Sequence, residues 1–172
     1  MSLIGLVLRP LRRAAIAMIA IAFATPALAD CNDSPAPKVD WRRCYMDGRD
    51  FAGATLTGAE LRDATFSRAN LEKVDFSKAD AYRAKFYLAR LRGARFDDAR
   101  VAEADFSDAD LRGASFRNAD LRGTKLVGAD LREADLTGAN LRATDLFRAD
   151  LSGATWTDGK RRCAAGSIGQ CS

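Results

Sequence analysis

Apolar residues recur every five positions over residues 51–156. This register has 22 positions and 19 of them are Leu or Phe, the exceptions being Ala81, Val101 and Trp156. Two residues before each of them, from residue 54 to residue 154, 18 of 21 positions are Ala, and the others are Val74, Thr124 and Thr144. The residue between the pair is usually polar. A pattern this regular predicts a repeat protein.

A period of five fits neither a long helix nor a straight strand. Five steps of about 100° would spread successive leucines around a helix, so no apolar stripe would form. In a strand, an odd period would move the apolar residue to the opposite face at every repeat. The small and the large apolar residue of each unit are two positions apart, which is typical of a short extended segment. The pattern therefore predicts an extended segment followed by a bend.

Glycine occurs at the position where this bend is expected. It stands two residues after the large apolar residue at positions 53, 58, 93, 113, 123, 128, 138 and 153. Glycine is the usual residue at corners that need a positive φ. A chain that bends in the same way after every five residues must coil, and we expect stacked coils to pair at about 4.8 Å.

The tandem units "ADLRG", "ADLRE", "ANLRA" and "ADLSG" resemble the pentapeptide-repeat family, and the resemblance covers about two-thirds of the chain. It implies an all-β fold, a right-handed quadrilateral β-helix with four pentads per coil. The 22 units would then form 5.5 coils. Two earlier units, Val39 with Trp41 and Cys44 with Met46, extend the register to six coils.

The resemblance also implies which side chains point into the coil. Stacking at 20-residue intervals would place the weak units Ala81 and Val101 next to each other on one face, with Tyr82 outside, and we expect the neighbouring Phe columns to fill this thinner part of the core. The predicted core ladder is Phe51, Leu56, Leu61, Phe66, Leu71, Phe76, Phe86, Leu91, Phe96, Phe106, Leu111, Phe116, Leu121, Leu126, Leu131, Leu136, Leu141, Leu146, Leu151 and Trp156.

The composition changes along the chain predict four segments. Residues 1–29 have a basic start, a short apolar run and an A-x-A ending, which is typical of a signal peptide cleaved after Ala29. A retained anchor is the alternative, although the run is shorter than the roughly 20 residues of a membrane span. We expect an N-terminal cap over residues 30–48, the β-helix over 49–158 and a C-terminal cap over 159–172.

Cleavage would place the protein in the periplasm or outside the cell and would change its charge. The formal net charge falls from +4 to +1, because residues 30–172 contain 24 Lys and Arg against 23 Asp and Glu. A balanced surface gives no electrostatic reason to bind nucleic acid or a membrane surface. We expect no nucleic-acid partner and no membrane span after signal removal.

Four cysteines lie near the ends of the predicted rod. An exported chain meets oxidising conditions, so an even number of cysteines favours disulfides. Zinc is the weaker alternative, because the chain has no histidine and no C-x₂-C spacing. Pairing across the ends would span several coils, beyond the reach of about 7 Å between Cα atoms. We predict Cys31–Cys44 and Cys163–Cys171, with Trp41 and Trp156 closing the openings.

Two outward patterns are candidates for binding. Arg92, Arg112 and Arg132 recur at 20-residue spacing beside Asp110, Asp130 and Asp150. They could form an anion-binding stripe, but a self-neutralised, solvated face is the favoured interpretation. The second pattern is a broken line of apolar residues on one face, and the possible partner face consists of Tyr87, Leu88, Val127 and Phe147.

The sequence favours a binding or structural function over catalysis. It has no histidine, P-loop, G-x-S-x-G or metal-binding spacing, so we expect no catalytic residues, cofactor, metal or small-molecule substrate. We predict an exported module in the cell envelope with an unknown protein partner. Some members of the family resemble DNA and bind topoisomerases of the gyrase type. The export signal, the near-neutral charge and a C-terminal segment without helical periodicity disfavour this alternative.

Overall fold

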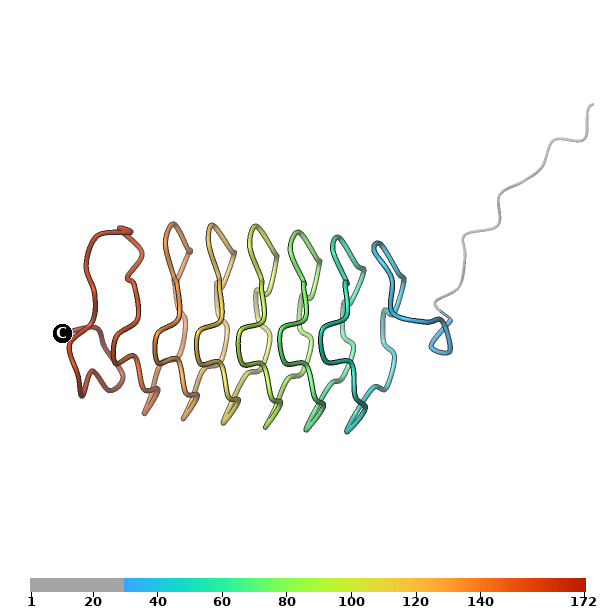
Figure 1. Cartoon of the computed structure of the whole chain (residues 1–172), viewed down its shortest axis with the longest axis horizontal. Helices are drawn as coiled ribbons and strands as arrows, with labels where there is room; N and C mark the ends of the chain where they lie inside the picture. The colour runs from blue at the N-terminus through green and yellow to red at the C-terminus, as the bar shows by residue number, and fades with distance from the viewer. Residues whose placement is uncertain (1–29) are drawn as a thin grey trace, which may run out of the picture.

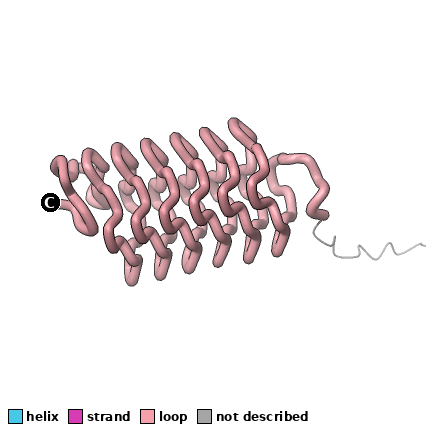
Figure 2. The backbone as a smooth tube through the Cα atoms, turned by 90° about the horizontal axis from the view of Figure 1, so that it is seen from below, coloured by secondary structure: helices cyan, strands magenta, loops and turns pink. Residues whose placement is uncertain are grey.

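The computed structural model describes residues 30–172, and the predicted signal peptide lies outside the described residues. Residues 30–172 contain no α-helix and no continuous β-strand; their regular structure consists of isolated β-bridges separated by turns. Figure 2 shows the result as a continuous tube without helices, wound into stacked coils. No helix within residues 30–172 is long and apolar enough to cross a membrane.

Each parallel bridge joins a residue to the residue 20 positions later. The bridges run without interruption from Asp40↔Glu60 to Asp135↔Thr155. Leu61 N donates to Asp80 O at 2.7 Å, and Asp80 N donates to Ala59 O at 2.9 Å, so neighbouring coils are linked in both directions. Figure 1 shows the coils side by side along the long axis. One coil therefore takes 20 residues, while the total of 5.5 to six coils stays a prediction.

The bend after each extended unit is a tight turn with a left-handed residue. Ala54 N donates to Phe51 O at 2.9 Å, and Gly53, the third residue of this turn, directly before the donor, has φ +71°. A positive φ at the third residue is the mark of a type II turn. Every corner from residue 38 to residue 153 has a positive φ, including corners occupied by Asp63, Arg68 and Leu88. The bend is thus imposed by stacking even where glycine is absent.

The large apolar residues point inward and form four columns, which define four faces. The first face begins with Trp41, the second with Met46, the third with Phe51 and the fourth with Leu56, each continuing at 20-residue intervals. Most of these side chains and their preceding alanines are buried. The core is therefore a solid stack inside the coil, as the pentad pattern predicts.

Phenylalanines of the second and fourth faces meet across the core. Phe76, Phe96 and Phe116 stack on one another along one column, with centroid distances of 4.8 and 4.9 Å. Phe96 also meets Phe86 and Phe106 edge-on, at 5.8 and 5.5 Å. Offset and edge-to-face contacts of this kind add to the stabilisation from burial. They bring bulk to the middle of the rod beside Ala81 and Val101, which are fully buried.

The N-terminal end of the rod is well covered. Cys31 is bonded to Cys44, as expected from the sequence. Trp41 is fully buried, and its ring lies 5.2 Å from Phe51 and 6.4 Å from Phe66, measured between centroids. Trp41 therefore closes this opening of the core.

The C-terminal end is covered on two faces only. Residues 161–169 run back antiparallel over the third and fourth faces, with bridges Asp150↔Ile168 and Thr155↔Arg162, and Cys163 is bonded to Cys171. Figure 1 shows this red segment folded against the last coil. On the second face the cap reaches only Gly169, beside the backbone of Leu146 and Arg148, and within residues 30–172 no backbone hydrogen bond of the cap reaches the N–H groups of Leu141, Ala143, Leu146 or Arg148.

This incomplete cap corrects three assignments in the predicted core ladder. Leu141, Leu146 and Trp156 are half-buried rather than enclosed. The two leucines have no further coil above them, and Trp156 lies at the edge of the cap with the Arg161 guanidinium 5.8 Å from its ring centroid. Trp156 therefore does not plug the opening in the way that Trp41 does.

Candidate functional site

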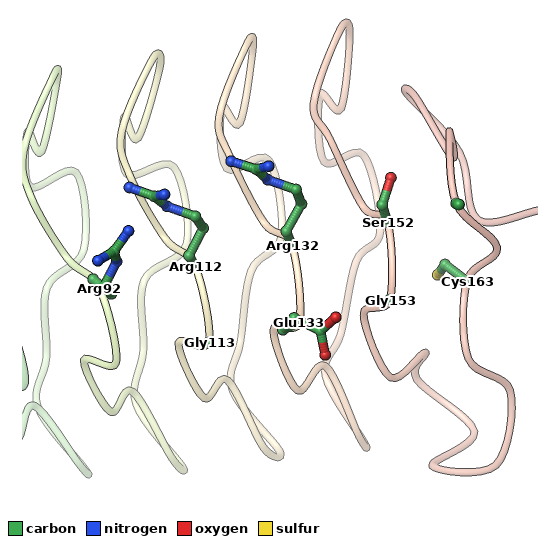
Figure 3. A pocket seen from close by; sticks show the side chains of 9 residues that line it. Arg92, Arg112, Gly113, Arg132, Glu133, Ser152, Gly153 and Cys163 are labelled. Carbon is green, nitrogen blue, oxygen red and sulfur yellow. The ribbon is translucent and has the colours of Figure 1, made fainter.

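The third face carries a hollow beside the C-terminal cap, which we call the arginine groove. Its volume is about 580 Å³, and it is lined by Arg92, Arg112, Gly113, Arg132, Glu133, Ser152, Gly153, Cys163 and Ala165. Leu111 and Leu131 point inward, so the arginine that follows each of them points outward. Glycine two positions after the leucine, as at Gly113, leaves the corner without a side chain. In Figure 3 the three arginines extend toward the same side of the coil.

Each central arginine is held by the aspartate two residues before it. Arg112 N donates to Asp110 Oδ1 at 3.3 Å, and Arg112 Nε donates to the same oxygen at 2.7 Å. The same geometry recurs at Arg132 and Asp130, at 3.2 and 2.8 Å. The hydrogen bonds from Arg112 are the main reason that the pKa of Asp110 lies below its ordinary value, and burial opposes them. Asp110 is therefore an ionised partner of Arg112 at neutral pH.

The ion pairs continue from coil to coil. Arg112 Nε lies 3.4 Å from Asp130 Oδ2, and Arg132 Nε lies 3.7 Å from Asp150 Oδ2. Arginine and aspartate thus alternate up the third face, which supports the self-neutralised interpretation over an anion stripe. Arg92 differs, because Arg90 stands at the position that Asp110 and Asp130 occupy before Arg112 and Arg132, and no carboxylate within residues 30–172 lies within 4 Å of its guanidinium.

The cap closes one end of the arginine groove. Glu133 forms an ion pair with Arg162 of the cap, and Figure 3 shows the Glu133 side chain beside Arg132, on the coil next to that of Gly153. Ser152 donates to Asp150 Oδ1 at 2.6 Å and accepts from Gly166 N at 3.0 Å, which joins the last coil to the cap. The polar groups at this end are satisfied by the fold itself, so they hold the cap in place.

The predicted partner face lies on the second face of the coil. Phe147 is 66% exposed, and Tyr87 and Leu88 are 37% and 39% exposed. Val127 is half-buried. The structure adds Tyr45, which is 81% exposed at another outward position of the same face. The repeat already placed Tyr45 on this face, because it directly precedes Met46, the first inward residue of the second face.

A third cluster surrounds Tyr82 on the first face and was not foreseen in detail. The guanidinium carbons of Arg62, Arg83 and Arg100 lie 5.6, 4.9 and 4.6 Å from the ring centroid. Arg62 and Arg100 pair with Asp80. Tyr82 is therefore the centre of a compensated cation–π cluster above the thin part of the core.

The titratable side chains of these surfaces are engaged with one another. Within residues 30–172, no three His, Cys, Asp or Glu side chains are grouped so that they could hold a metal ion. The four cysteines are used in disulfides. The arginines and aspartates neutralise one another, and the pKa values of Asp110, Asp120 and Asp150 are lowered, away from the range of a general acid or base at neutral pH.

Coils of four pentads around a Leu and Phe core define a class of solenoid. The sequence model described as "Pentapeptide repeats" matches residues 50–86, 89–126 and 114–153, in eight copies. The chain belongs to the pentapeptide-repeat family, which confirms the resemblance seen in its sequence. Its fold is the right-handed quadrilateral β-helix of that family, whose members are generally non-enzymatic structural or binding modules.

Solved structures of other pentapeptide-repeat proteins resemble this one. HetL, involved in heterocyst differentiation regulation in the cyanobacterium Nostoc sp. strain PCC 7120, is 28% identical, with 74% of this chain and 73% of HetL covered and a TM-score of 0.47. A protein from the Arabidopsis thaliana thylakoid lumen is 30% identical, with 66% and 69% covered and a TM-score of 0.40. QnrB1, a plasmid-mediated fluoroquinolone resistance protein, is 20% identical, with 72% of each chain covered and a TM-score of 0.35. No curated protein matches the chain significantly.

Proposed function

We propose that this chain is an exported, non-enzymatic solenoid that binds a partner protein in the cell envelope through its second face. The observation that carries the proposal is the exposure of large apolar side chains on that face, above all Phe147 at 66% and Tyr45 at 81%. Exposed apolar residues gathered on one face are typical of interaction surfaces. The packed interior supports a binding function on the outside of the rod, because it is filled by the stacked rings.

Site-specific photo-crosslinking in intact cells tests the partner face. A photoreactive phenylalanine analogue at Val127 should give one crosslinked band that is independent of expression level. The control is the same analogue at Thr137, which follows its inward leucine in the same way but lies on the opposite, fourth face. Equal crosslinking at both positions, or none at either, would contradict the proposed face.

Export is tested separately. Fractionation should recover the protein from the periplasm or medium, and its intact mass should correspond to a chain that begins at Asp30. The basic and apolar segments of residues 1–29 support this expectation. Recovery from the cytoplasm with residues 1–29 intact would refute export.

Charge disfavours the topoisomerase-binding alternative. A DNA mimic needs a strongly negative surface, whereas residues 30–172 hold 24 basic and 23 acidic side chains. We therefore expect the purified protein to leave DNA supercoiling by gyrase unchanged. Inhibition at stoichiometric concentrations would restore that alternative.

A further inference from the structure

The last coil has an open rim over its first and second faces. In the preceding coil, the N–H groups of Leu121, Gly123, Leu126 and Gly128 donate to carbonyls of the next coil at 2.8–3.0 Å. The equivalent N–H groups in the last coil make no hydrogen bond within residues 30–172; they belong to Leu141, Ala143, Leu146 and Arg148. The carbonyls of Ala139 and Thr144 also receive none there. We call residues 139–148 the open rim.

Apolar side chains accompany these backbone groups. Leu141 and Leu146 are half-buried, although Leu121 and Leu126, one coil earlier, are fully buried. Phe147 is exposed beside them. The rim therefore presents a sheet edge and part of the core together, a combination that promotes pairing with another extended chain.

The cap shows what kind of chain fits such an edge. On the other half of the same coil, Leu151 N donates to Ser167 O at 2.8 Å, and Gly153 N donates to Cys163 O at 2.9 Å. In return, Cys163 N donates to Ala154 O at 2.9 Å. An extended antiparallel segment thus satisfies both donors and acceptors of this edge. The rim continues directly from the cap, whose Gly169 lies beside Leu146 and Arg148.

The charged side chains of the open rim favour a binding segment that carries an acidic residue. The open rim carries Arg142 and Arg148 against Asp145, and neither arginine has a carboxylate within 4 Å among residues 30–172. A segment with an acidic residue would compensate them, and apolar residues would cover Leu141 and Leu146. The rim offers about ten residues, whereas a stable protein–protein interface uses roughly 20–30 residues a side. A second copy stacked on the rim alone would therefore be held weakly.

We propose that the open rim binds an extended, acidic and apolar peptide segment of a partner protein, which pairs antiparallel with residues 141–148 and continues the path of the cap. This is recognition by strand addition, in which the main chain gives affinity and the side chains give selectivity. The inference uses the end of the rod, which shares Phe147 with the partner face but does not include Val127, so the peptide test and the Val127 crosslinking test can fail separately.

The test uses a displayed library of linear ten-residue peptides selected against the oxidised protein, followed by binding measurements on the enriched peptides. Enriched peptides should be acidic and apolar, and should slow amide hydrogen exchange at Leu141, Ala143 and Leu146. Failure to enrich any peptide, or protection at other amides, would overturn the proposal.

Variants separate the rim from other surfaces. The double substitution Arg142→Glu and Arg148→Glu leaves the core untouched and should weaken peptide binding about tenfold. Leu146→Lys should do the same, whereas Ala52→Lys, at an exposed position of the third face far from the rim, should leave affinity unchanged. Equal affinity for the charge-reversed and the unmodified protein would overturn the proposal. So would a concentration-dependent dimer that protects the rim amides without peptide, because a second copy would then occupy the rim.

Discussion

The ring of Phe86 stacks on that of Phe106, with centroids 4.6 Å apart and planes inclined by only 7°. The two residues are 20 positions apart in the sequence and equivalent in successive coils. Their contact is one example of the packing found throughout the repeat, in which each inward side chain packs on the equivalent side chain of the next coil.

Truncating the most enclosed ring should be costly. Phe96 stacks on Phe76 and Phe116 and meets Phe86 and Phe106 edge-on, so Phe96→Ala would leave a cavity among four rings. We expect a loss of about 3–5 kcal/mol in the free energy of unfolding, measured by urea denaturation. Tyr45→Ala, at an 81% exposed position, should change it by less than about 0.5 kcal/mol. Similar losses for both variants would contradict the stacked core.

Substitutions at the corners test the left-handed backbone conformation without changing any core side chain. Gly113 has φ +63°, and a Cβ there would meet no atom within 4 Å, so Gly113→Ala tests backbone conformation alone. We expect a loss of about 1 kcal/mol, because L-residues disfavour the left-handed region. Arg68, with φ +59°, offers the reverse change, and Arg68→Gly should be neutral or stabilising by thermal denaturation. A gain from Gly113→Ala would show that the corner is not left-handed.

Stability should fall in acid. The pKa values of several aspartates on the outer faces are lowered by hydrogen bonds to their folded neighbours; they are Asp75, Asp110, Asp120, Asp135 and Asp150. A carboxylate with a lowered folded pKa stabilises the protein above its unfolded value, near 3.9, and loses that contribution as the pH falls through the folded value. We therefore expect the free energy of unfolding to be constant above about pH 5 and to fall below about pH 4. Urea denaturation at a series of pH values measures it.

Asp110→Asn should make this acid decline shallower, because it removes one of the linked protons. Asp33→Asn, at an exposed position of the N-terminal segment, is the matched control for the loss of one carboxylate. An acid profile that Asp110→Asn leaves unchanged would refute the role of the Asp110–Arg112 pair.

The two disulfides should act locally on different ends. Replacing Cys163 and Cys171 by serine removes an eight-residue link, and replacing Cys31 and Cys44 removes a 13-residue link. Each should cost about 2–3 kcal/mol. Hydrogen exchange at Leu151 and Gly153, whose amides donate to the cap, should accelerate only in the C-terminal variant. Equal acceleration in both variants would mean that the cap does not depend on its own disulfide.

The repeated part of the molecule was predictable because it obeys one local rule. The inward positions of Phe66 and Leu91, the left-handed corner at Gly113 and the alternation of Arg112 with Asp130 all follow from the period of five combined with 20 residues per coil. A repeat fixes each residue's surroundings through its nearest neighbours, so a single sequence contains the needed information.

The ends were not predictable in the same way. The path of residues 161–169 depends on which half of the last coil a non-repeating segment covers, and no periodicity encodes that choice. This path leaves Leu141, Leu146 and Trp156 half-buried. It also places Cys163 against the last coil, where it lines the arginine groove. The arginines around Tyr82 escaped prediction because their rotamers are set by contacts between coils.

The central claim is that residues 20 positions apart in the sequence lie at equivalent places in successive coils. Distances between spin labels at such outward positions test this claim most directly. Pulsed electron resonance would compare the pair at Tyr45 and Lys125 with the pair at Tyr45 and Asp145, all exposed on the second face. The separations should be about 19 and 24 Å between backbones, increasing by about 4.8 Å for the added 20 residues. Separations that fail to increase, or that increase by much more than one strand spacing, would contradict the 20-residue coil.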